Sequence, residues 1–82
     1  MKRIITIILL ILTINLANSQ EVKYINASEL NVREGAGTNF SVITKVSENE
    51  KVTIISEQGK WSEIETENGT KGFVLTKFLS IS

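Results

Sequence analysis

The sequence predicts an all-β fold, a small closed barrel of five or six short strands, preceded by an N-terminal signal peptide. Three observations predict the barrel. After residue 20, β-branched residues alternate with polar ones, which is the period of a half-buried strand. Polar turns, several of them with glycine, separate these runs at close spacing, as in small barrels. No stretch with helical periodicity interrupts them.

The N-terminus has the layout of a signal peptide. Lys2 and Arg3 precede an apolar block over residues 4–14, and the small residues Ala17 and Ser19 stand ahead of a cut after position 19. The alternative is an uncleaved membrane anchor, but a spanning helix needs about 20 mostly apolar residues. We therefore expect residues 1–19 to be removed, leaving no permanent membrane anchor. The rest would be exported, to the periplasm or the extracellular space.

Length and composition constrain the part of the chain after the signal. Eighty-two residues allow one domain, which we place at residues 22–82. The sequence contains no cysteine, histidine or aspartate. A disulfide is therefore impossible, and the ordinary ligands of a zinc site are missing. The sequence predicts no metal and no cofactor, and a domain of this size must be held by packing and hydrogen bonds alone.

The charge of the exported part argues against nucleic acid as a partner. The whole chain has 9 basic and 9 acidic residues, and the basic ones include Lys2 and Arg3 of the signal. The remainder thus has 7 basic and 9 acidic residues, a formal net charge of −2. Nucleic-acid binding requires clustered lysine and arginine, and no such cluster is present.

The first half of the domain contains three expected strands. Residues 22–27 are rich in β-formers, and residues 30–33 alternate apolar with polar side chains. Residues 34–39 contain two glycines and are expected to form a loop. Residues 42–46 give the next strand, which ends at a polar cluster typical of a turn.

The second half continues in the same way. Residues 51–57 are dominated by β-branched side chains and give the strongest strand prediction. A turn at 58–60 leads to a strand over 61–66. Asn68-Gly69, a strong hairpin signal, then leads to a returning strand over 70–74. A last strand is expected around residues 79–81.

Alternation along these strands predicts which side chains face inward. Trp61 and Phe73 should point the other way or lie at the barrel rim. The expected core consists of Val32, Val42, Val52, Ile54, Ile64, Val74 and Leu79.

Several residues have expected structural roles. Gly35 and Gly37 would allow positive φ in the long loop. Gly72, within a strand, indicates a bulge or a close approach of two backbones. Arg33, next to the loop, can donate hydrogen bonds to loop carbonyls, with direct ligand contact as the alternative role.

Five landmarks in order resemble the bacterial Src homology 3 (SH3-like) domain family. They are Leu30-Asn31-Val32-Arg33, then Glu34-Gly35-Ala36-Gly37-Thr38 with Val42-Ile43, then Gly59-Lys60-Trp61, Gly72-Phe73-Val74 and Phe78-Leu79. The resemblance runs from about residue 22 to residue 80. It implies an SH3-like barrel and a binding module without catalytic activity.

Bacterial members of this family commonly accompany cell-wall hydrolases and are thought to hold cell-wall peptides. The resemblance thus implies a cell-wall peptide or glycan as the partner. The alternative is a scaffold role, in which the domain docks on another envelope protein. Eukaryotic relatives bind proline-rich peptides, but here Leu75 stands where they have a proline. We therefore do not expect proline-rich ligands.

The candidate ligand-binding residues are mostly aromatic. Trp61, the only tryptophan, lies beside a turn, and large aromatics at a rim often both pack and bind. If the resemblance holds, Trp61, Phe73 and Phe78 converge on one apolar shelf next to the glycine-containing loop. Phe40 and Arg33 complete the candidate set, and for each phenylalanine the competing role is core packing.

The sequence offers no candidate catalytic residue. Without cysteine or histidine there is no cysteine–histidine centre. Paired carboxylates can cleave glycosidic bonds, and Glu63, Glu65 and Glu67 alternate in sequence. We expect them to form a solvated outer edge that discourages aggregation.

Overall fold

The computed structural model describes residues 20–82, and the expected signal peptide lies outside the described residues. The fold is all-β, as predicted, although the strands number seven rather than five or six within this part of the chain. Among these residues there is no helix both long and apolar enough to cross a membrane. The strands are β1 (Glu21–Ile25), β2 (Glu29–Arg33), β3 (Val42–Ser47), β4 (Lys51–Gln58), β5 (Trp61–Glu65), β6 (Lys71–Leu75) and β7 (Leu79–Ser80), with a 3₁₀ turn, η1 (Thr76–Phe78), between the last two.

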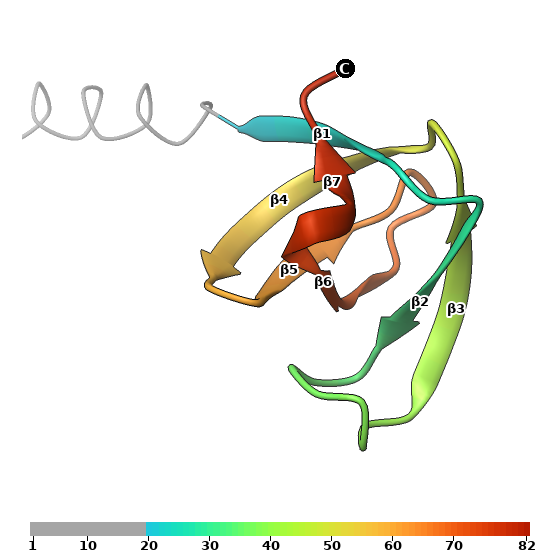
Figure 1. The fold of residues 1–82 in the computed structure, drawn as a ribbon, viewed down its shortest axis with the longest axis vertical. Helices are drawn as coiled ribbons and strands as arrows, with labels where there is room; N and C mark the ends of the chain where they lie inside the picture. Colours follow the sequence, from blue (N-terminus) through green and yellow to red (C-terminus); the bar gives the residue numbers. More distant parts are fainter. Residues whose placement is uncertain (1–19) are drawn as a thin grey trace, which may run out of the picture.

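All strand pairs are antiparallel and belong to one sheet in the order β3-β2-β6-β5-β4-β1-β7. The sheet is strongly bent, so that β1 and β7 lie at one end and the β2–β3 hairpin at the other (Figure 1). Backbone hydrogen bonds tie the last residue of β1 and the residue after it to the segments that precede β4 and β7. The amide of Ile25 donates to Glu50 (2.9 Å), and that of Asn26 donates to Phe78 (2.8 Å).

One hydrophobic core lies on the inner face of the bent sheet, and every strand from β1 to β6 contributes to it. The buried apolar residues are Ile25, Leu30, Val32, Val46, Val52, Ile64 and Val74. Ile54 and Leu79, both expected in the core, pack against its margin. The core residues of the described part of the chain therefore lie between positions 25 and 79.

Val42 was expected in the core, and this was wrong: its side chain is 43% exposed. Period two would place Val42 on the inward face with Val46. However, the register between β2 and β3 shifts after Val32, which pairs with Thr44, so that Arg33 pairs with Val42. This bulge inserts Ile43 as an extra residue and moves Val42 to the outer face. Leu30 and Val46, facing each other before the bulge, fill the core instead.

Turn conformations agree with the sequence at two hairpins and differ in the long loop. Gly59 (φ +70°) and Gly69 (φ +92°) have positive φ, as does Asn49 (φ +70°). Gly35 and Gly37 do not, so the expected role of their φ angles was wrong. These two glycines instead leave space for neighbouring side chains: a Cβ on Gly35 would lie 2.7 Å from the Phe40 ring, and one on Gly37 would lie 2.7 Å from Oδ1 of Asn39.

Gly72 confirms the expected close approach of two strands. A Cβ at this position would lie 2.5 Å from Cγ1 of Val32 and 2.8 Å from the carbonyl oxygen of Arg33. Only a residue without a side chain allows β6 to pass so close to β2. This contact joins the β2–β3 hairpin to the rest of the sheet.

Candidate functional site

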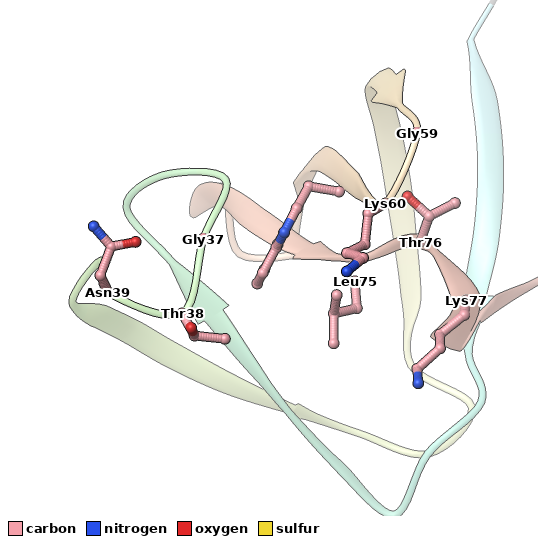
Figure 2. A pocket seen from close by; sticks show the side chains of 9 residues that line it. Gly37, Thr38, Asn39, Gly59, Lys60, Leu75, Thr76 and Lys77 are labelled. Carbon is pink, nitrogen blue, oxygen red and sulfur yellow. The ribbon is translucent and has the colours of Figure 1, made fainter.

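An open cleft of about 730 Å³ lies between the start of β5, the end of β6 and the loop after β2. Trp61 and Leu75 are cross-strand partners in the β5–β6 pair, and both line the cleft. In Figure 2, Lys60, Leu75 and Lys77 lie on one side of the cleft, and Gly37, Thr38 and Asn39 lie on the other. The lining residues are Gly37, Thr38, Asn39, Gly59, Lys60, Trp61, Leu75, Thr76 and Lys77.

Strand alternation brings Trp61 to this surface. Along β5, Ser62 and Ile64 are buried, so Trp61 points to the opposite, outer face and is half-buried. The positive φ of Gly59 turns the chain immediately before it. The prediction that Trp61 and Phe73 point away from the core is confirmed, since Phe73 alternates in the same way with buried Gly72 and Val74.

Two hydrogen bonds fix the η1 side of the cleft. The hydroxyls of Ser62 and Thr76 lie 2.7 Å apart, and the amide of Thr76 donates to the carbonyl of Lys60 over 2.8 Å. Since Thr76 begins η1, these bonds hold the turn that carries Lys77 against the start of β5.

Arg33 holds the loop that forms the opposite side. Its Nη1 donates to the carbonyls of Thr38 (3.1 Å) and Phe40 (2.9 Å). The expected structural role of Arg33 is therefore confirmed. The base of the loop is closed by the amide of Glu34, which donates to Ser41 (2.9 Å).

A second, smaller hollow of about 260 Å³ adjoins the cleft. It shares Thr38, Trp61 and Leu75 with the first, so these three residues lie where the two hollows meet. The surface is thus longer than one side chain and suits an extended ligand. The other residues of the second hollow are Glu29, Leu30, Asn31, Arg33 and Lys45.

The structure brings only part of the predicted aromatic shelf together. Trp61 lines both hollows. Phe73 shares the outer face and pairs with Arg33 and Glu63, but it lines neither hollow. Phe78 packs against the core instead, so the expected convergence of Trp61, Phe73 and Phe78 on one shelf was wrong. Phe40 is 44% exposed, and its ring lies against Gly35.

Sequence reasoning missed Leu75, although a signal for it was present. The hairpin places Glu65 opposite Lys71, and counting back along β5 and forward along β6 leads to Trp61 opposite Leu75. Lys60 and Lys77 were missed as well. They are far apart in sequence, and the hydrogen bond between Thr76 and Lys60 brings their segments together.

The acidic residues of β5 do not form an edge. β5 lies between β4 and β6, so the expected edge role of Glu63 and Glu65 was wrong, and Glu67 lies in the turn beyond the strand. Glu65 lies opposite Lys71 in the β5–β6 strand register. Within residues 20–82, no group of three or more histidine, cysteine or acidic side chains is arranged to hold a metal ion.

The cleft has a basic lining. Two charged residues line it, and both are lysines: Lys60 in the β4–β5 turn and Lys77 in η1. The Nζ of Lys77 lies 5.2 Å from the ring centroid of Phe78, within the range of a cation–π contact. Lys60 and Lys77 have no ion-pair partner among the described residues.

Comparison with known proteins places this surface in a family context. Residues 28–80 match the family model described as "Bacterial SH3 domain". The chain is 38% identical over 58 residues to YrvJ of Bacillus subtilis, which is named as an N-acetylmuramoyl-L-alanine amidase. That match covers 71% of this chain and 11% of YrvJ.

Two further relatives are proteins named p60 and described as endopeptidases. The protein from Listeria monocytogenes is 41% identical over 59 residues, covering 71% of this chain and 12% of p60. The protein from Listeria seeligeri is 38% identical over 64 residues, covering 77% and 12%. The chain therefore spans little more than a tenth of the length of these curated relatives.

Proposed function

The chain belongs to the bacterial SH3 domain family, and we propose that residues 22–82 act as a non-catalytic module that binds peptide or glycan material of the bacterial cell wall. The observation that carries this proposal is the open cleft over Trp61 and Leu75. An aromatic and an aliphatic side chain, both half-buried and opposite each other in the strand register, provide apolar contact area. The surrounding polar groups can orient a ligand.

The shape of the surface favours an extended ligand. The cleft and the second hollow meet at Thr38, Trp61 and Leu75, so one chain can cross both. Asn31 and Thr38 offer side-chain donors and acceptors for the peptide groups or hydroxyls of such a chain. A buried small-molecule substrate would need a deeper enclosure than this surface provides.

The relatives support the choice of ligand class. YrvJ is named for a bond between N-acetylmuramic acid and L-alanine, which is a bond of peptidoglycan. The segment that this chain shares with YrvJ and p60 is small compared with their whole length. In this chain the shared segment contains the residues that line the cleft. It contains no cysteine, histidine or aspartate, which are common catalytic residues.

Retention on purified peptidoglycan tests the proposal. A polypeptide of residues 20–82 would be mixed with insoluble peptidoglycan, and the bound fraction compared between wild type, Trp61→Ala and Trp61→Leu. Ile55→Ala is the matched control, because Ile55 is an exposed apolar residue on β4 outside the cleft. We expect the wild type and the control to be retained, and both Trp61 variants to lose most of their retention.

Absence of retention of the folded wild type on any wall preparation would overturn the proposal. Cross-linking in the native compartment then decides the alternative. Capture of one dominant envelope protein through a photoreactive group at position 61 would indicate a docking role on that protein. Retention that does not depend on Trp61 would indicate that the binding surface lies outside the cleft.

We further propose that residues 1–19 are a cleaved signal peptide and that the domain works outside the cytoplasmic membrane. The basic pair Lys2-Arg3, the apolar block and the small residues before position 20 support this. Mass spectrometry of the protein recovered from the envelope or the medium tests it. We expect a chain that begins at Gln20, whereas an intact N-terminus in the membrane fraction would contradict the proposal.

A further inference from the structure

We propose that the cleft selects ligands with a free carboxylate, which is held by the ammonium groups of Lys60 and Lys77. The inference rests on the proposed function, since it concerns the same surface and names the chemistry of its ligand. It begins from the charges that line the cleft. Both charged lining residues are lysines, and no acidic side chain of residues 20–82 lines it.

These two lysines are available to a ligand. Two of the other lysines have acidic partners: Lys23 lies 2.7 Å from Glu57, and Lys45 lies 3.6 Å from Glu29. Lys51 and Lys71 have none among residues 20–82, but they lie outside the cleft. Lys60 and Lys77 have no such partner among the described residues. The first nineteen residues contain no aspartate or glutamate that could supply one.

The fold holds the two lysines in the part of the cleft that is not shared with the second hollow, and we call this part the basic end. Lys60 precedes Trp61 in the β4–β5 turn, and Lys77 follows Thr76 in η1. The amide of Thr76 donates to the carbonyl of Lys60, so the two backbone segments are fixed to each other. Lys60 and Lys77 also lie on the same side of the cleft in Figure 2. A carboxylate at this end would therefore meet two positive charges.

The basic end contrasts with the rest of the domain. The part of the chain after residue 19 has a formal net charge of −2, so the molecule as a whole does not attract anions. Attraction of a carboxylate is instead local to the cleft. At an ionic strength of about 0.1 M, charges more than roughly 10 Å apart are largely screened. Acidic residues that lie farther away than this therefore have little effect on the attraction between the two lysines and a carboxylate.

The arrangement also assigns an orientation to a peptide ligand. A peptide carries a free carboxylate at its C-terminus, and amidation removes that charge. With the carboxylate at Lys60 and Lys77, the preceding side chain lies over Trp61 and Leu75. The chain then continues into the second hollow, where Asn31 is available for hydrogen bonds.

Chemical amidation of the wall tests this inference. Purified peptidoglycan would be treated with a carbodiimide and ammonia, which converts its carboxylates to amides, or treated without the carbodiimide. Retention of residues 20–82 would be measured on both materials. The variants are Lys60→Gln with Lys77→Gln, and as matched control Lys51→Gln with Lys71→Gln. The control pair removes the same charge from exposed strand positions outside the cleft.

We expect amidation to weaken binding of the wild type and of the control roughly three- to tenfold, the size of two exposed ion pairs. The Lys60/Lys77 variant should bind both materials equally and weakly. Melting curves establish that each variant is folded, and the single variants replace the double one if it is not.

Other outcomes separate this inference from the proposed function. If the untreated wall retains the wild type through Trp61 and amidation changes nothing, the cell-wall function stands and the carboxylate preference is wrong. An equal loss of binding in the two double variants, Lys60/Lys77 and Lys51/Lys71, would also overturn the preference. It would indicate a general attraction between positive charge and the wall. If the untreated wall does not retain the wild type at all, the proposed function itself fails.

Discussion

The side-chain oxygens of Ser62 and Thr76 lie 2.7 Å apart, and this hydrogen bond joins the interior of the domain to the candidate binding cleft. Ser62 is wholly buried among apolar core residues, whereas Thr76 lines the cleft. A buried hydroxyl without a partner is costly, so Ser62 fixes where η1 begins. The position of Lys77 therefore depends on a residue that no ligand can touch.

Ser62→Ala should lower the free energy of unfolding by about 1 kcal/mol, because it removes the hydrogen bond between the Ser62 and Thr76 hydroxyls. Chemical denaturation measures this change. Ser41→Ala, at an exposed position, should change it by less than about 0.5 kcal/mol. Equal effects of the two substitutions would show that the bond between Ser62 and Thr76 contributes nothing to stability.

Gly72→Ala should destabilise the domain by about 1–3 kcal/mol, the usual cost of overpacking. The added Cβ would lie 2.5 Å from Cγ1 of Val32. In the double variant with Val32→Ala that methyl group is gone, so the combined loss should be smaller than the sum of the two single losses. Strict additivity in denaturant titrations would contradict the close contact between β6 and β2.

Arg33→Met should loosen the loop between β2 and β3, because the Thr38 and Phe40 carbonyls lose their shared donor. We expect faster hydrogen exchange at the amides of residues 34–40 and weaker retention on peptidoglycan. Lys51→Met, which removes a charge from an exposed site on β4, should change neither. If retention falls while loop exchange stays unchanged, Arg33 acts by touching the ligand and not by holding the loop.

The ion pair between Lys23 and Glu57 should make stability depend on pH in the alkaline range. Its hydrogen bond, with Nζ 2.7 Å from Oε2, raises the pKa of Lys23 above the usual 10.5. A raised pKa in the folded state means that the contribution is complete below pH 10.5 and is lost as pH rises through the folded value.

Comparison with Glu57→Gln isolates this contribution from the other groups that titrate at alkaline pH. The stability advantage of the wild type should be constant at neutral and mildly alkaline pH and should shrink above about pH 10.5. The measurement is the melting temperature of both proteins across that range. An advantage that does not change with pH would mean that the pair does not affect folding.

Most of the fold could be predicted from local sequence. Period-two alternation identified the strands, and Asn68-Gly69 identified a hairpin whose glycine has φ +92°. Val42 was misplaced because a bulge at Ile43 reverses the alternation. Such a bulge depends on how β2 and β3 fit the whole sheet, and no residue type near Ile43 marks it.

The candidate site was less predictable because it depends on contacts between distant segments. Trp61 was found because a tryptophan beside a turn is conspicuous. Phe78 was grouped with it because of the family resemblance, yet Phe78 is only partly buried and packs against the margin of the core. Lys60 and Lys77 are ordinary as single residues, and their proximity results from one backbone hydrogen bond, between Thr76 and Lys60.

The most direct test of the binding cleft is an NMR titration of ¹⁵N-labelled residues 20–82 with soluble peptidoglycan fragments. We predict that the largest shift changes fall on the Trp61 indole, Leu75 and the amides of residues 37–39, with saturable dependence on ligand. Shift changes confined to residues 66–70, in the turn at the other end of the β5–β6 pair from Trp61 and Leu75, would contradict a binding role for the cleft, as would a complete absence of changes.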